Sequence, residues 1–201
     1  RDSYVWEHLW FKVLLGIIAM VLVSAITIYI VHKVNEERLR REKERMLTFL
    51  SYNDELTGAL NRHALDERTD AFEIKSTLGI VFGDIMGLKN VNDTDGHEAG
   101  DALILRAYSV MKEVAGEKNV YRTGGDEFVI LLEDTSKEDV EKLVSELSEK
   151  LKAGDSETAL GYSWTDSYAG NYAELQRIAD EMMYEDKKKR YKEMGYVRGH
   201  V

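Results

Sequence analysis

The chain has 201 residues, with 37 acidic and 27 basic side chains and a formal net charge of -10. This charge argues against a protein that coats nucleic acid, and the lack of cysteine excludes disulfides and thiolate metal sites and fits a reducing compartment. The length allows one domain of ordinary size with an additional segment. The absence of proline and the first residue, Arg1, suggest an excerpt from a longer protein.

Residues 13–31 form an uncharged apolar run, VLLGIIAMVLVSAITIYIV. As a helix with about 1.5 Å rise per residue, this run nearly matches a hydrocarbon core of roughly 30 Å. Trp6, Trp10 and Tyr29 lie near its ends, where aromatic side chains favour the membrane interface. The alternatives are a buried core helix, which is seldom apolar all round, and a signal peptide, although no small-residue cleavage site follows Val31. We therefore expect a transmembrane helix.

Positive charge is concentrated after this run. Only Arg1 and Lys12 precede it. Six cations follow it closely: Lys33, Arg38, Arg40, Arg41, Lys43 and Arg45. The positive-inside rule then puts the C-terminal side in the cytoplasm. The prediction is a single-pass protein of the inner membrane, with the lipid bilayer as one of its partners.

The segment 32–52 is predicted to be a charged signalling helix, because glutamates alternate with its cations at helical spacings. Leu39, Met46 and Leu50 share one stripe, which fits either a short coiled-coil seam or a plain solvated helix. The predicted organisation is an extracytoplasmic flank (1–12), a transmembrane helix (13–31), the signalling helix (32–52) and a catalytic domain (53–201).

Helix and strand patterns alternate in the C-terminal part. Helices are predicted over 61–72, 87–93, 101–116, 137–154 and 172–193, with a loop over 94–100. Strands are predicted over 78–84 and 157–164, and 119–134 predicts two strands joined by a Gly-Gly turn. This order predicts an α/β layer with a mixed sheet covered by helices.

Two carboxylates lie where these predicted strands end. Asp84 terminates a buried apolar strand, and Asp126 lies at the hairpin tip, where Gly124 and Gly125 let the chain turn. Charges at the ends of buried strands are costly unless a cation or a partner uses them. If the hairpin lies beside the first strand, the carboxylates converge and form a hard-oxygen site suited to magnesium and substrate phosphates.

The segment between them carries groups suited to a nucleotide. Gly87 leaves room for a phosphate near the main chain, and Lys89 adds a positive charge. The amide of Asn92 and the carboxylate of Asp101 match the donor and acceptor edge of guanine, and His97 lies between them. Each has a simpler alternative: Asn92 and Asp101 as helix caps, and Lys89 as a surface lysine.

Four motifs in order resemble the GGDEF domain, the catalytic module of diguanylate cyclases. They are DELTGALNR at 54–62, DIMGLKNVNDTDGHEAGD at 84–101, RTGGDEF at 122–128 and ADEMMYEDK at 179–187. The resemblance implies an α/β (α+β) fold, with a mixed, mainly antiparallel sheet flanked by helices, similar to nucleotidyl cyclases and the polymerase palm.

The resemblance also implies a metal site that holds Mg²⁺, or Mn²⁺. Its ligands correspond to Asp84, the main-chain carbonyl of Ile85, and Asp126. Asp126 further corresponds to the proton acceptor for the attacking 3′-hydroxyl, and the adjacent Glu127 helps to hold metal.

For the substrate, the resemblance implies that Asn92 and Asp101 bind guanine and that His97 makes a further contact. Lys89 and Lys187 correspond to lysines that bind phosphate.

Three departures from the family pattern stand out. Met86 replaces a polar residue and cannot bind magnesium, which implies an altered rate. Tyr191 stands where many members have a cation that touches phosphate, with Arg190 or Lys188 as substitutes. Ala115 and Lys118 stand in place of the Arg-x-x-Asp product-inhibition site, so this site is expected to be absent.

The resemblance therefore predicts an enzyme that condenses two GTP into cyclic di-GMP, with release of two pyrophosphates, across a homodimer. One alternative is a catalytically silent GGDEF domain that senses GTP or scaffolds partners. A relative with an adenine-containing product is another, against which Asp101 argues.

Overall fold

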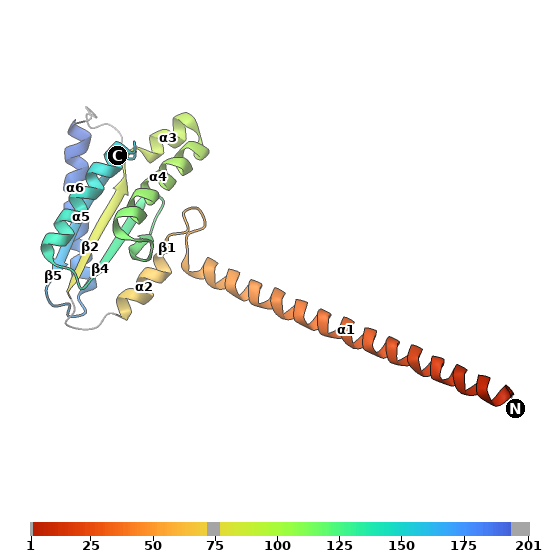
Figure 1. Ribbon diagram of the computed structural model, residues 1–201. Helices are drawn as coiled ribbons and strands as arrows, with labels where there is room; N and C mark the ends of the chain where they lie inside the picture. The colour runs from red at the N-terminus through yellow and green to blue at the C-terminus, as the bar shows by residue number, and fades with distance from the viewer. Residues whose placement is uncertain (1, 72–76, 194–201) are drawn as a thin grey trace. The chain divides into compact units, whose positions relative to one another are not determined.

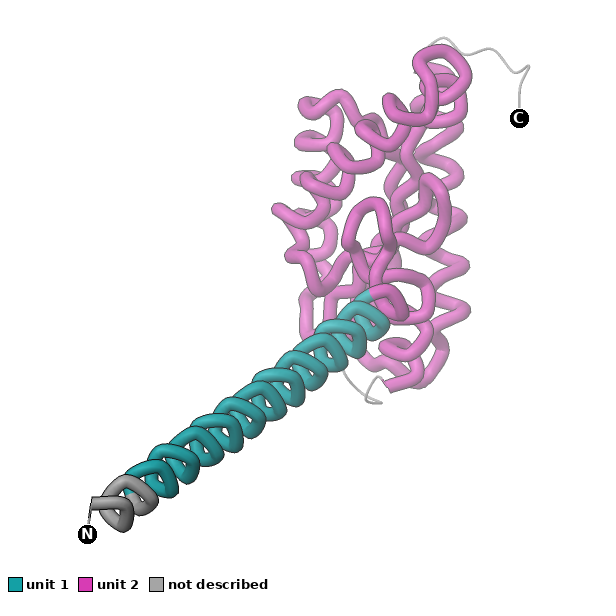
Figure 2. Tube along the Cα trace, turned by 90° about the vertical axis from the view of Figure 1, so that its right-hand side faces the viewer, with its two compact units in different colours: residues 1–49 teal, residues 50–201 magenta. Residues whose placement is uncertain are grey.

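The computed structural model describes residues 2–71 and 77–193, with side chains from residue 9 onward. The chain divides into two compact units, Arg1–Phe49 and Leu50–Val201 (Figure 2). The predicted place of Trp6 at the membrane interface concerns a side chain that lies outside the described ones.

The N-terminal unit consists of one long helix, α1 (Asp2–Tyr52), whose last residues belong to the second unit. The part Leu9–Tyr52 contains a stretch long and apolar enough to cross a membrane. Its large side chains are exposed, for example Met20 and Ile28. Because apolar side chains all round a helix favour an apolar environment, α1 is a candidate membrane span.

The C-terminal unit is built on a five-stranded sheet in the order β1-β3-β4-β2-β5. The strands are β1 (Leu60–Asn61), β2 (Leu78–Ile85), β3 (Val120–Arg122), β4 (Glu127–Glu133) and β5 (Thr158–Thr165). Only β1 and β3 run parallel, whereas β2 pairs antiparallel with β4 and β5, and β3 pairs antiparallel with β4. The prediction of a mixed, mainly antiparallel sheet is confirmed.

Helices cover both faces of this sheet (Figure 1). They are α2 (Arg62–Asp70), α3 (Leu88–Asp95), α4 (His97–Ala115), α5 (Lys137–Ala153) and α6 (Tyr172–Glu193), with the 3-10 turn η1 (Glu117–Asn119). One core cluster joins α4 and α5 to one face, and the other joins α2 and α6 to the opposite face. Successive residues of β2 alternate between the clusters, as expected for a strand buried on both sides.

The loop predicted over 94–100 is mostly helical. Helix α3 ends at Asp95 and α4 already begins at His97, so Gly96 alone joins them. Gly96 has φ 88°, a conformation that glycine adopts without strain. Its N–H donates to the carbonyl of Asn92, and its own carbonyl accepts from Ala99. Gly96 thus ends one helix and starts the next. The turn-forming residues around it led to the prediction of a loop instead.

Helix α6 approaches β5 so closely that only glycine fits at Gly161. A Cβ there would lie 2.2 Å from both the carbonyl oxygen of Ala179 and the amide nitrogen of Met183. One turn beyond Met183, the same helix carries Lys187 toward the end of β2. The missing side chain of Gly161 thus sets where Lys187 lies.

The outer edge of β5 is covered by a side chain of α6. The Asp186 carboxylate accepts the main-chain N–H of Leu160 at 2.9 Å and a bond from Arg190 at 2.7 Å. Arg190 also donates to the Ser148 hydroxyl on α5 at 2.8 Å. This network satisfies an edge-strand donor and fixes the end of α6 against its neighbours.

Candidate functional site

The candidate site begins where β2 and the β3–β4 turn lie side by side. Asp84 of β2 pairs in register with Glu127 of β4, and the Ile85 N–H donates to the Asp126 carbonyl at 3.0 Å. Asp84 is buried, Asp126 half-buried and Glu127 exposed. Like charges directly opposite each other destabilise a sheet unless something offsets them. Asp84, Asp126 and Glu127 thus bring three acidic groups together at one end of β2.

Lys187 of α6 supplies an opposite charge to this cluster. Its Nζ lies 2.8 Å from Oδ2 of Asp84 in a largely buried ion pair. Burial raises the pKa of Asp84, as do Asp126 and Asp180, although Lys187 lowers it. Burial lowers the pKa of Lys187, but the Asp84 carboxylate outweighs it and the net pKa is raised. The neighbouring carboxylates thus favour the protonated form of Lys187, so Lys187 stays charged.

One carboxylate oxygen in this cluster has no partner. Oδ1 of Asp84 is buried and accepts no hydrogen bond, which is costly for a charged group. Within residues 2–71 and 77–193, no three acidic or histidine side chains form a metal-binding group by themselves. The donors at hand suit a hard divalent cation that completes its coordination with main-chain oxygens, water and phosphates. The residues present fit Mg²⁺ in that manner.

A second corner of the site lies at the junction of α3 and α4. The Asn92 amide packs against Gly100, whose neighbour in sequence is the exposed Asp101. Lys89 and His97 are exposed at the starts of α3 and α4. Asn92 and Asp101, predicted to act together, are therefore carried by adjoining parts of this junction.

Both expected substitutes for Tyr191, Lys188 and Arg190, already have partners. Lys188 pairs with Glu185 at 2.6 Å, and Arg190 is engaged with Asp186 and Ser148. Tyr191 itself is half-buried against the core cluster of α2 and α6. Of the described cations on this helix, Lys187 is the one paired with Asp84.

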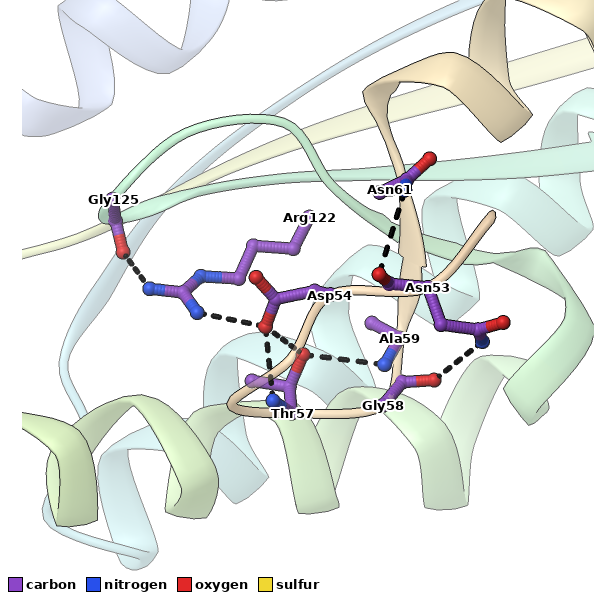
Figure 3. A network of polar contacts seen from close by, with 8 residues as sticks. All are labelled: Asn53, Asp54, Thr57, Gly58, Ala59, Asn61, Arg122 and Gly125. Atoms are coloured by element: carbon purple, nitrogen blue, oxygen red, sulfur yellow. Dashed lines mark hydrogen bonds and ion pairs between the residues drawn. The ribbon is translucent and has the colours of Figure 1, made fainter. Parts of the chain in front are cut away.

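Arg122 connects the turn to the segment that follows α1, a link that sequence reasoning missed (Figure 3). Its guanidinium donates to Oδ1 of Asp54 and to the carbonyl of Gly125, both at 2.8 Å. The Asp54 carboxylate also accepts from the N–H and hydroxyl of Thr57. The two charges lie 68 positions apart in sequence, so no local pattern reveals the pair.

Replacing Arg122 by methionine is expected to lower the free energy of unfolding by about 2 kcal/mol. The Arg122 side chain is 11% exposed and that of Asp54 24%, so the cost lies between those of surface and fully buried pairs. Denaturant titration measures the change. Arg177→Met, which removes an exposed pair with Glu181, is the control and should cost less than about 0.5 kcal/mol.

Arg122→Met should also change how the free energy of unfolding depends on pH in the acid range. Burial raises the pKa of Asp54, but hydrogen bonds from Thr57 and Arg122 outweigh it, so its pKa is lowered. A lowered pKa stabilises the fold above the ordinary carboxyl pKa of about 3.9, and this stability disappears as pH falls through the folded pKa. Arg122→Met should lose less stability than wild type on acidification. An equal loss in both would contradict the assignment.

Comparison with known proteins identifies relatives of this chain. Residues 51–193 match the family described as "Diguanylate cyclase, GGDEF domain". The chain is 30% identical to diguanylate cyclase DgcN of Escherichia coli (strain K12), covering 79% of this chain and 42% of DgcN. It is 29% identical to an uncharacterized membrane protein of Staphylococcus saprophyticus, covering 65% of this chain and 42% of that protein. The chain thus spans less than half the length of either relative.

A solved structure shares the fold. The coiled coil and GGDEF domain of DgcB from Caulobacter crescentus, in complex with c-di-GMP, gives a TM-score of 0.66 at 23% identity. The match covers 78% of this chain and 91% of that chain.

Proposed function

Because the chain belongs to the GGDEF domain family, which matches residues 51–193, we propose that it is a diguanylate cyclase. In this proposal it condenses two GTP into cyclic di-GMP and two pyrophosphates. The observation that carries the proposal is the convergence of Asp84 and Asp126 at one end of β2, with an unpartnered oxygen on Asp84. Relatives such as DgcN, named as a diguanylate cyclase, support the same reaction.

The proposed roles of the acidic residues follow from their placement. Asp84, the Ile85 carbonyl and Asp126 hold Mg²⁺ or Mn²⁺, and Glu127 lies beside them at the start of β4. The bound cation, when present, lowers the charge of the triphosphate. Lys187, already within reach of Asp84, binds phosphate, as does Lys89 at the start of α3.

The guanine of the substrate is bound at the junction of α3 and α4. Asn92 and Asp101 read the edge of guanine, and His97 contacts the substrate from the start of α4. A carboxylate accepts from the paired N–H donors of guanine, which adenine lacks at that edge. This pairing favours GTP over ATP.

In the bond-forming step, Asp126 accepts the proton of the 3′-hydroxyl. The freed oxygen bonds to the α-phosphorus of the second GTP, the bond from that phosphorus to the bridging oxygen breaks, and pyrophosphate leaves. A second, equivalent step closes the ring. Each chain offers one half-site, so two copies face each other in a two-fold arrangement.

We further propose that α1 anchors this homodimer in the inner membrane through residues 13–31. The cations after Val31 support a cytoplasmic C-terminal unit, and the likeness to a membrane protein of Staphylococcus saprophyticus supports the membrane location. The lack of native cysteine allows a clean test. A membrane-impermeant maleimide should label Ser3→Cys in intact spheroplasts and label Ser145→Cys only after lysis. The reverse pattern would invert the topology.

The decisive test uses the 201-residue chain in lipid nanodiscs, incubated with GTP and Mg²⁺, and separates the products. Cyclic di-GMP and pyrophosphate in a ratio of one to two are expected. GTP binding without product would instead support the silent module that senses GTP or scaffolds partners. Added cyclic di-GMP should not slow turnover through an Arg-x-x-Asp site, because Ala115 at the end of α4 and Lys118 in η1 stand in place of its arginine and aspartate.

A further inference from the structure

Gly100 occupies a helical position where alanine would ordinarily be better. It lies in the first turns of α4, is buried, and carries a regular helical bond from its N–H to the Gly96 carbonyl. Glycine destabilises a helix relative to alanine. Local structure therefore gives no reason for a glycine, and the reason must lie in a neighbour.

The neighbour is the side-chain amide of Asn92. A Cβ on Gly100 would lie 1.9 Å from Oδ1 and 2.8 Å from Cγ of Asn92, and 3.2 Å from Cδ1 of Leu88. These first two distances are far inside van der Waals contact, whichever amide atom faces the helix. The missing side chain of Gly100 thus makes the space that the Asn92 amide fills.

We propose that Gly100 is a positioning residue for nucleotide specificity: it seats the Asn92 amide beside Asp101. The inference rests on the proposed function, because Asn92 and Asp101 are there assigned to the guanine edge. An amide held against Gly100 lies at the residue that directly precedes Asp101, so the two residues assigned to guanine are kept on adjoining parts of α3 and α4. An added methyl at position 100 turns the amide away, since the clashing atoms belong to a short side chain that can rotate.

The steric cost should therefore fall on recognition rather than on the fold. At Gly161 the crowding atoms belong to the main chain, whereas at Gly100 the nearest belong to Asn92. Gly100→Ala should consequently keep or raise the midpoint of thermal unfolding. Its affinity for guanine nucleotide should fall about tenfold, as expected for the loss of one well-formed polar contact.

The experiment measures binding to the full chain in nanodiscs by titration calorimetry with Mg²⁺. The probes are an unreactive GTP analogue with a methylene between the α and β phosphorus atoms, and inorganic tripolyphosphate. The variants are Gly100→Ala, Asn92→Ala and the double variant. Gly16→Ala, the same change inside helix α1 at a position where a Cβ would meet nothing within 4 Å, is the control.

Gly100→Ala should weaken the GTP analogue about tenfold and leave tripolyphosphate unchanged. In the Asn92→Ala background the same substitution should have no further effect, because the clashing amide is gone. Unchanged binding of the analogue by Gly100→Ala, or independent effects in the double variant, would overturn the inference. So would equal losses for both probes.

The outcomes also separate this inference from the cyclase proposal. If wild type binds the analogue with the expected pattern but forms no cyclic di-GMP from GTP, only the cyclase proposal fails. If wild type does not bind the analogue, both fail.

Discussion

Substituting Asp126 by alanine should reduce formation of cyclic di-GMP by about a thousandfold or more while GTP binding persists. The proposed general base alone is worth about 10²–10⁴-fold, and the same carboxylate is a proposed metal ligand. Binding should persist because Asn92, Asp101 and the two lysines proposed to bind phosphate are untouched. Product separation after incubation with GTP and Mg²⁺ measures turnover, and calorimetry measures binding.

Two further variants sharpen this prediction. Asp126→Asn keeps an oxygen that can bind a metal ion, but an amide is not basic enough to take up the 3′-hydroxyl proton. Its turnover should therefore remain low. Asp166→Ala removes an exposed carboxylate next to Thr165, which pairs with Leu78 at the opposite end of β2 from Asp84. Its turnover should match wild type. Normal turnover by Asp126→Ala would refute the assignment of Asp126.

Much of the fold follows from the sequence because its signals are local. The strand over Leu78–Ile85 and the helix over Tyr172–Glu193 are long and strongly patterned, and both were predicted nearly at their observed bounds. The short strand β1 was not predicted. It has two residues and exists through pairing with β3, so its cause lies 61 positions away along the chain.

The candidate site likewise has features that the sequence predicts and features that depend on contacts between distant segments. Asp84 and Asp126 stand out in the sequence because carboxylates interrupt apolar runs. Their convergence required that β2 lie beside β4, which the sheet now provides. The pairing of Lys187 with Asp84 spans 103 positions and depends on how α6 packs, so it was not predicted; the family resemblance pointed to Lys187 only as a lysine that binds phosphate.

Gly161→Ala should destabilise the C-terminal unit by about 3 kcal/mol or more, at the upper end of the usual cost of overpacking. The new Cβ would lie 2.2 Å from main-chain atoms of Ala179 and Met183, which cannot rotate aside. The midpoint of thermal unfolding, measured by circular dichroism, should fall by roughly 6 °C or more. Because α6 must shift, Lys187 should also lose its contact with Asp84.

Controls distinguish this effect from a general sensitivity of β5. Ser163 lies two residues further along the strand, and its buried hydroxyl has no hydrogen-bond partner, so Ser163→Ala should leave stability equal or higher. Adding Met183→Ala to Gly161→Ala should restore nothing, since the clash is with the main chain. Rescue by that truncation would show that side-chain packing, and not the main chain of α6, sets the approach at Gly161. The position of Lys187 over Asp84 would then be adjustable, whereas the present contacts make it a fixed consequence of the fold.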